Sequence, residues 1–466
     1  MAIGTFKLPI GSTTATASTT TYTRPADWLA MPTPGVQEVI GLMAVYDDGA
    51  NYVAFNCQGA FTVDWGDGTI TNYPSNTTVS YQHTFASLPS GTLTSKGFRQ
   101  ALVRITPQAG QNLTSVSFGN LNATLGKGFS PGWLEFDIRT PNALPTFSGG
   151  SNTIRYARLE KITVRQMGTQ NPQNWATNLF NLKSVYIEPS ETTGRTAFNN
   201  MFQNCYALVE VNLFDTSAGT NCSLMFNNCY SLETIPAFNF ASATDLTGAF
   251  SSMPSLKSVP AMTLAGNINQ IFLNNYNLKE ISSALNTNAV YFFQAMFQNC
   301  GSLVNVPLFN TSGGTIFTSM FAGCNSLTEI PLFNTAAATT MVGMFNGCNS
   351  LMYLPGLNTS NVTSLSQTFN NCWNLRELPA LNLPLCTNFN AWLDANTTLS
   401  KSNITGATRG HAYNGRSLSR VNIVTIFTNL GTASGTQTIN VSANPGRAGL
   451  TASEIAIATG KGWTVV

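Results

Sequence analysis

One pattern of apolar and polar positions returns through the middle of the chain. It reads Met-Phe, two polar or small residues, Cys, two further residues, Leu, two residues, Ile or Val before Pro, and then Phe-Asn-Thr. The anchor Phe residues are separated by 24, 24, 22, 25, 24, 24 and 24 residues: Phe202, Phe226, Phe250, Phe272, Phe297, Phe321, Phe345 and Phe369. A repeat of this length is too small to bury its own apolar face. We therefore expect a solenoid of about 24-residue coils with continuous internal ladders of Leu, Ile/Val and Phe.

Two further rows of residues predict where each coil turns. A Pro follows the Ile/Val/Leu position in six coils, where a central strand would lose a hydrogen-bond donor: Pro236, Pro260, Pro307, Pro331, Pro355 and Pro379. We predict a very short strand that kinks at this row. A row of Asn, with one Asp in the same phase, is expected to satisfy backbone groups at the turn that leaves each strand: Asp215, Asn239, Asn310, Asn334, Asn358 and Asn382.

Six of the nine cysteines occupy one position of the repeat, three residues after the anchor Phe. A metal site would need Cys and His at short spacing, and neither His83 nor His411 lies near this row. We expect small buried thiols that pack on one another, in preference to metal ligands or disulfides, and no cofactor. The predicted structural ladder is Phe202, Cys205, Phe226, Cys229, Phe297, Cys300, Phe321, Cys324, Phe345, Cys348, Phe369 and Cys372.

The frame weakens upstream, and the flanks of the chain have other patterns. The repeats place the solenoid at residues 109–395. Residues 36–108 alternate around the Gly66-Asp67-Gly68 turn and predict a small β-sandwich, in which Asp64 and Asp67 stabilise the turn in preference to binding calcium. Residues 1–35 are rich in Thr, Ser and Pro, and we expect an extended docking arm that is disordered or orders only on a partner.

Residues 396–466 predict a cap that covers the open end of the solenoid. The pattern indicates a helix near residues 418–430, a strand in Thr-Gln-Thr-Ile-Asn-Val-Ser, a second helix that begins near Ser453, and a final strand in Trp-Thr-Val-Val. Such a strand-helix unit is an atypical coil, as solenoids need at their ends.

The repeat phrase resembles the BspA-type leucine-rich repeat, on Met-Phe-x-x-Cys-x-Ser-Leu-x-x-Ile-Pro-x-Phe-Asn-Thr-Ser. A close variant of this repeat is common in bacterial surface proteins and in bacteriophage virion proteins. Residues Trp65 to Gly68 and His83 to Phe85 are similar to the PKD-type immunoglobulin-like domain. The predicted fold is therefore mostly β with short helices: a leucine-rich-repeat solenoid, preceded by a small immunoglobulin-like β-sandwich and closed by an α/β cap.

Charge and targeting signals narrow the function classes. Only 9% of residues are charged and the net charge is +2. No basic run could neutralise a series of phosphates, so we expect no nucleic-acid partner. No segment is apolar for long enough to cross a bilayer, and the N-terminus lacks the apolar region of a secretory signal. We expect no membrane insertion, and either a trimmed mature chain or a route without the general export path.

The sequence contains none of the common catalytic motifs, such as a nucleophile elbow, a zinc-binding His pair or a phosphate-binding loop. Paired carboxylates remain the one route to an enzyme, and we expect none. A row at the start of the strands should point outward as a solvated face, and its polar groups are candidates for hydrogen-bonding sugars or a protein partner. This candidate binding face comprises Glu210, Thr234, Ser258, Glu280, Asn305, Glu329, Tyr353 and Glu377.

The resemblance, the low charge and the arm favour a non-enzymatic bacteriophage virion protein, a tail fibre, adhesin or capsid decoration protein that presents a repeat surface. Its location would be the virion, assembled in the host cytoplasm. Its expected partners are other virion proteins, bound through the N-terminal arm, and a host surface glycan or protein, and we expect a homo-oligomer. A bacterial cell-surface adhesin is the alternative, and a glycan-cleaving tailspike is a remote one.

Overall fold

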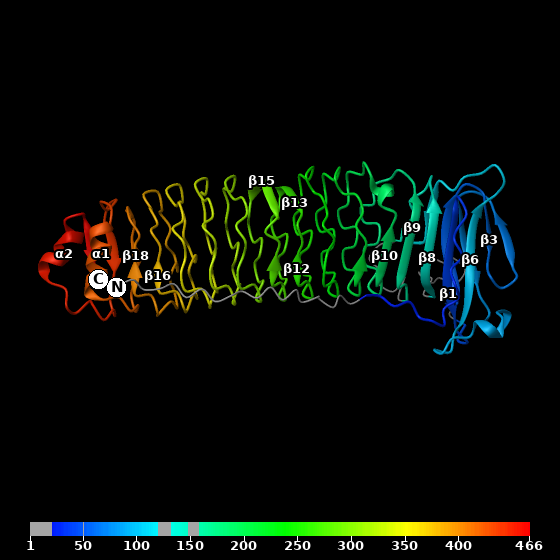
Figure 1. Cartoon of the computed structure of the whole chain (residues 1–466), viewed down its shortest axis with the longest axis horizontal. Helices are drawn as coiled ribbons and strands as arrows, with labels where there is room; N and C mark the ends of the chain where they lie inside the picture. The colour runs from blue at the N-terminus through cyan, green and yellow to red at the C-terminus, as the bar shows by residue number, and fades with distance from the viewer. Residues whose placement is uncertain (1–20, 50, 120–131, 148–157) are drawn as a thin grey trace, which may run out of the picture.

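The structure is a computed structural model that describes residues 21–49, 51–119, 132–147 and 158–466. This part of the chain is mostly β and forms one elongated rod (Figure 1). A β-sandwich lies at one end, stacked coils fill the middle, and two short α-helices lie at the other end. One buried apolar cluster runs through all three parts, from Val39 to Trp463. The predicted fold class is confirmed.

Two sheets form the sandwich, an eight-stranded sheet ordered β11-β10-β9-β8-β1-β6-β3-β4 and a three-stranded sheet ordered β5-β2-β7. Phe55 lies 6.1 Å from Phe61 and 6.2 Å from Trp65, measured between ring centroids, in the core between the sheets. Three short 3-10 helices lie at Phe85–Ser87, Ser90–Thr92 and Pro189–Thr192. The strands are β1 Glu38–Val45, β2 Tyr52–Gln58, β3 Phe61–Asp64, β4 Ile70–Tyr73, β5 Thr77–Gln82, β6 Arg99–Pro107, β7 Ser115–Ser117, β8 Trp133–Thr140, β9 Lys161–Met167, β10 Ser184–Ile187 and β11 Glu210–Val211.

The large sheet continues across residue 108, where the sequence pattern places the boundary between the sandwich and the solenoid. Strand β1 of the sandwich pairs antiparallel with β8, and β8 pairs parallel with β9 of the coils. Strand β7, in the segment expected to open the solenoid, pairs antiparallel with β2. All eight residues of β1 are buried, as in a strand that is covered on both faces. The sandwich therefore serves as the first layer of the solenoid core.

Residues 21–35 of the predicted arm contact this chain's own sheet, which corrects the expectation that they are disordered or order only on a partner. Arg24 Nε lies 2.6 Å from Glu135 Oε2 on β8, and Tyr22 N donates to Glu210 Oε2 on β11 at 3.3 Å. Trp28 packs against Leu42, Ala44, Phe98 and Leu134. Burial of its large indole removes apolar surface from water and holds the segment in place. The first 20 residues of the arm lie outside the described residues.

The coils carry very short strands, as the Pro row predicts. Strands β12 Ser258–Val259 and β16 Glu377–Leu378 are two residues long, and each ends directly before a Pro. Strand β14 Glu280–Ile281 is equally short and pairs parallel with β12. On another side of the coils, β13 Thr263–Asn267 pairs parallel with β15 Asn286–Phe292. Single parallel bridges continue that second row through later coils, joining Phe292, Ile316, Thr340, Ser364 and Asn388 in turn.

Two residues per coil adopt the left-handed backbone conformation, four positions apart. Asn200 and Asn204 have φ of 56° and 63°. Asn and Gly tolerate this conformation better than other residues, which explains why the repeat places one of them directly before most of its cysteines. The second of the two positions, which we call the left-handed row, comprises Asn178, Asn204, Asn228, Ser252, Asn274, Asn299, Gly323, Gly347, Asn371 and Ala395.

Backbone hydrogen bonds then join each coil to the next at the anchor Phe. Phe297 N donates to Met320 O and Phe321 N to Met344 O, both at 2.9 Å. The Phe rings stack along the rod, with adjacent centroids 5.1 to 5.9 Å apart from Phe202 to Phe369. All twelve residues of the predicted structural ladder are buried.

The cysteine thiols make hydrogen bonds between coils. Cys324 Sγ donates to Phe297 O at 3.1 Å, and Cys348 Sγ donates to Phe321 O at 3.1 Å. Burial raises the pKa of the Cys324 thiol to about 12. The thiol is therefore held as a neutral donor, and all nine cysteines are free and buried. In one coil that lacks this cysteine, Asn275 Nδ2 donates to Phe250 O at 3.0 Å in its place.

The Asn row and the Thr that follows it share the turn after each strand. Asn310 Oδ1 accepts from Ser312 N at 3.0 Å, which closes the local turn. Thr311 Oγ1 is directed along the rod and donates to Asn334 O of the next coil at 2.9 Å. The same bond recurs from Thr335 to Asn358 at 2.9 Å. The expected role of the Asn row at the turn is seen directly, and the Thr adds a bond between coils.

The cap continues the stack beyond the predicted boundary at residue 395, because β16 pairs parallel with β17 Lys401–Ser402. Strands β18 His411–Ala412, β19 Gln437–Asn440 and β20 Trp463–Val465 form a parallel sheet, and the helices are α1 Arg420–Asn429 and α2 Ala452–Thr459. Helix α2 begins at Ala452, near Ser453 as predicted, behind a capping box of Thr451 and Glu454. Lys461 Nζ donates to Thr428 O and Leu430 O at the end of α1, at 2.6 and 2.8 Å.

Candidate functional surface

The eight residues of the predicted binding face lie one per coil, and none of them is buried. Glu280, Asn305, Glu329 and Tyr353 are exposed, whereas the other four are half-buried. Ser258 and Glu280 are paired residues of neighbouring strands. Equivalent positions in adjacent coils are about 4.8 Å apart. These residues therefore form a continuous row, which we call the outward strip: Glu210, Thr234, Ser258, Glu280, Asn305, Glu329, Tyr353 and Glu377.

Two glutamates at the ends of the strip are held by neighbouring side chains. Glu210 Oε1 accepts a hydrogen bond from Ser184 Oγ at 2.5 Å. Glu377 Oε1 accepts from Lys401 Nζ at 2.7 Å and from Asn403 Nδ2 at 2.6 Å. The Lys401 hydrogen bond lowers the pKa of Glu377. A general acid needs a raised pKa, and the environment of Glu377 shifts its pKa in the opposite direction.

The other two glutamates, Glu280 and Glu329, are exposed and lie two coils apart, at about 9.6 Å between equivalent backbone atoms. Asn305 lies between them in the strip. Carboxylate pairs that cleave glycosides flank the scissile bond, with one pKa raised by its environment. The strip therefore suits contact with a partner better than acid-base chemistry.

Exposed apolar side chains accompany the middle of the strip. Leu308 and Leu332, each 63% exposed, occupy equivalent positions in adjacent coils, directly after the Pro row. Val304 and Met352 are exposed at the position before the strip. A single exposed apolar residue is ordinary, whereas a group of them on one face marks an interaction surface. We call Val304, Leu308, Leu332, Met352 and Tyr353 the apolar patch.

A second exposed feature is formed by the residues that lie directly after the Cys position in successive coils. Phe180, Tyr206 and Tyr230 stack face to face, with centroids 4.8 and 4.7 Å apart. Pro254 and Tyr276 occupy the next two coils. We call these five residues the aromatic ridge. Sequence reasoning missed the ridge, although three Tyr directly after the Cys position were a usable signal.

Both histidines are buried among aromatic rings and lie away from the outward strip. Burial lowers the pKa of His83, and its Nδ1 lies 3.3 Å from Asp67 Oδ2. Burial also lowers the pKa of His411 to about 4, and its Nδ1 contacts Arg409 O at 2.8 Å. Asp64 Oδ1 and Asp67 Oδ1 accept from Gly66 N and Thr69 N, both at 3.0 Å, as expected for turn stabilisation. Within the described ranges, no group of three His, Cys, Asp or Glu could hold a metal ion.

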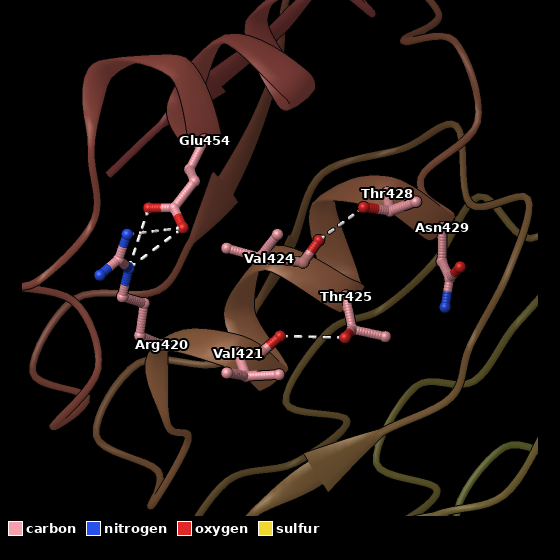
Figure 2. A pocket seen from close by; sticks show the side chains of 7 residues that line it. All are labelled: Arg420, Val421, Val424, Thr425, Thr428, Asn429 and Glu454. Atoms are coloured by element: carbon pink, nitrogen blue, oxygen red, sulfur yellow. Dashed lines mark hydrogen bonds and ion pairs between the residues drawn. The ribbon is translucent and has the colours of Figure 1, made fainter.

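The cap contains a hollow of about 350 Å³ between its two helices (Figure 2). At one side, Arg420 Nε lies 3.0 Å from Glu454 Oε1. The Thr425 and Thr428 hydroxyls donate to the carbonyls of Val421 and Val424, both at 2.9 Å, within α1 itself. The Glu454 carboxylate and both Thr hydroxyls are therefore already engaged within the cap.

The stacked coils, their ladders and the repeat phrase define the class of the protein as a repeat solenoid. Residues 165–262 and 266–380 match the family model described as Mycoplasma protein of unknown function, DUF285. This match and the solenoid together fit a BspA-type repeat protein. A comparison with curated proteins gave no match. Neither helix of the described ranges is a candidate membrane span.

Proposed function

We propose that the chain is a non-enzymatic structural protein of a bacteriophage virion that presents the outward strip and the apolar patch to a host surface glycan or protein. The observation that carries the proposal is the apolar patch, because its exposed side chains lie on a rod whose internal ladders are buried throughout. Covering such a patch releases free energy through the hydrophobic effect. The proposed role is that of a tail fibre, an adhesin or a capsid decoration protein.

Three properties support a role as a rigid presenting element. The coils are joined by backbone, thiol and hydroxyl hydrogen bonds, so the patch is held on a fixed frame. The repeat resembles those of virion proteins, and the low charge suits a surface that recognises a neutral partner. The attachment of residues 1–20 to other virion proteins, a homo-oligomeric state and the PKD-type character of the sandwich belong to the same proposal.

The experiment that tests the location is an inventory of purified phage particles by mass spectrometry, together with electron microscopy of particles labelled with an antibody against this chain. We expect the chain on the particles at a fixed copy number. The position of the label on head or tail would separate decoration from attachment. Absence from purified particles would overturn the virion proposal.

The match to a family described as Mycoplasma proteins favours a second candidate, a bacterial cell-surface adhesin. The same antibody distinguishes the two candidates, because an adhesin would be recovered in the cell envelope and labelled on intact cells. The apolar patch and the outward strip would then face another cell or a matrix component.

A further inference from the structure

We infer that a groove on the aromatic ridge is a binding site for a neutral saccharide, held between Tyr230 and Tyr276 above Pro254. The groove has a volume of about 330 Å³, within the range of small-molecule sites. It is a site separate from the outward strip, and it supplies a ligand class for the proposed presenting role. Its lining residues, all uncharged, are Asn228, Tyr230, Ser252, Pro254, Asn274 and Tyr276.

The groove arises where a ladder of asparagine amides is interrupted. In the left-handed row, Asn228 Nδ2 donates to Asn204 Oδ1 at 2.8 Å, and Asn299 Nδ2 donates to Asn274 Oδ1 at 2.8 Å. Each amide thus donates toward the N-terminal coil and accepts from the C-terminal one. Ser252 occupies the position between Asn228 and Asn274 and has no amide to continue the ladder.

The interruption leaves one acceptor and one donor facing the same gap. By the direction of the ladder, Asn228 Oδ1 and Asn274 Nδ2 are the two atoms that an amide at position 252 would join. Among the described residues, neither atom has a hydrogen-bond partner in the structure. An amide that is not paired within the protein can exchange bound water for a ligand hydroxyl without the loss of a hydrogen bond inside the protein.

Two aromatic walls enclose this polar pair. One face of the Tyr230 ring is covered by Tyr206, with the two rings 5° from parallel, so its other face is available to the groove. Tyr276, 52% exposed, stands two coils away from Tyr230, about 9.6 Å between equivalent backbone atoms. Because each carbon contact takes about 3.5–4.0 Å, this gap admits one saturated six-membered ring between the two side chains.

This chemistry fits a neutral saccharide. A sugar ring has apolar C–H faces that pack on aromatic rings, and its rim carries hydroxyls that each donate and accept hydrogen bonds. One amide acceptor and one amide donor across the gap match such hydroxyls. A Pro-rich peptide would need a longer aromatic track, and the next positions along the ridge are Gly301, Asn325 and Asn349.

Two variants test the site by different routes. Tyr276→Ala removes one wall. Ser252→Asn places an amide at a position with φ of 56°, where Asn is tolerated, so that it continues the ladder and closes the gap without disturbing the core. Trp373→Ala is the matched control, because Trp373 is 54% exposed at the same repeat position outside the groove.

The purified full-length chain is screened against immobilised neutral oligosaccharides built from hexoses and N-acetylhexosamines, with an acidic oligosaccharide and a Pro-rich peptide as counter-probes. We expect binding to a subset of the neutral probes, weakened about tenfold or more by Tyr276→Ala and by Ser252→Asn and unchanged by Trp373→Ala. Circular dichroism and thermal unfolding verify that each variant is folded.

Three outcomes would overturn the inference: no binding to any neutral probe, unchanged binding by a folded Ser252→Asn variant, or binding of the peptide or the acidic probe in place of neutral sugars. The assay uses the isolated chain and does not depend on where the protein resides. A negative binding result would therefore not contradict the virion proposal. A negative particle inventory would not contradict the saccharide site.

Discussion

The sheet-rich end of the rod and the Pro-rich coils are held together by different interactions. From β1 to β9, strands of seven to nine residues pair residue by residue in the large sheet, apart from the four-residue β3 and β4 at its edge. Between Met296 and Leu375, where the structure describes every residue, the coils contain no β-strand. Here the Phe stack, the thiol-to-carbonyl bonds and the Thr-to-carbonyl bonds join one coil to the next, together with single backbone hydrogen bonds such as Phe321 N to Met344 O.

In the Pro-rich coils, side chains supply part of the hydrogen bonding between neighbours that backbone groups supply in a sheet. A Pro row removes backbone donors, so extended ladders cannot form at that edge of the coil. Thr and Cys supply donors from side chains instead, because each points along the rod at a fixed repeat position. The coils keep their spacing as long as identical residues occupy identical positions.

The strongest test of this difference is Phe321→Ala in the Pro-rich coils. The ring lies 5.8 Å from Phe297 and 5.9 Å from Phe345, between centroids, and is fully buried. We expect a loss of about 3–5 kcal/mol in the free energy of unfolding, and faster hydrogen exchange in the two neighbouring coils. Urea unfolding and hydrogen-exchange mass spectrometry measure the two effects. The exposed Tyr353→Ala serves as control, and a loss under about 1 kcal/mol for Phe321→Ala would contradict the role of the stack.

The repeat made the solenoid predictable, because identical residues at a fixed spacing can stack in few ways. The Phe anchors, the buried thiols and the short strands before Pro follow from their types and positions alone. The fusion of the sandwich with the coils could not be predicted in this way, because pairing between β1 and β8 joins residues 90 to 101 positions apart. The packing of Trp28 could not be predicted either, since nothing in a mostly polar segment indicates that one indole would fix it to the sheet.

The candidate surface was predictable in part. The repeat spacing predicts which residues form the outward strip. It does not show which of their charged side chains already have hydrogen-bond partners. Glu210 accepts from Tyr22 N, a contact across 188 positions of sequence. The groove at Ser252 depends on a departure from the repeat, a serine between Asn228 and Asn274 in the left-handed row, and the recurring pattern does not predict it.

The buried thiols of the coils predict a stability that falls at alkaline pH. The pKa of Cys324 is about 12 in the folded chain, whereas an unfolded thiol has a pKa near 8.5. Between these values the folded state keeps its proton and the unfolded state loses it, so rising pH favours unfolding. We expect each such thiol to lower the free energy of unfolding by about 2 kcal/mol at about pH 10. Below about pH 8 the thiol is protonated in both states and has no such effect.

The measurement compares urea unfolding of the natural chain at neutral and alkaline pH with that of a Cys324→Ala/Cys348→Ala variant. Tyrosines also titrate in this range, but they are common to both chains and cancel in the difference. The variant should start less stable and lose less as the pH rises. Equal pH dependence in both chains would show that these thiols are not held neutral by burial.

The exposed ion pair between Lys257 and Glu233 gives the smallest expected effect, and its comparison with a buried pair separates the two regions once more. Lys257 Nζ lies 2.6 Å from Glu233 Oε2, with side chains 47% and 22% exposed, whereas Arg24 at the sheet-rich end contacts Glu135, which is only 3% exposed. Lys257→Ala should cost under about 1 kcal/mol, and less at high salt, because water screens the pair. Arg24→Ala should cost about 2 kcal/mol and respond less to salt, since it leaves a buried carboxylate with Lys161 as its remaining cation, at 3.0 Å. Urea unfolding at low and high salt measures both. Equal costs would mean that water reaches Glu135 as freely as Glu233, and that the arm residues around Trp28 do not seal the sheet.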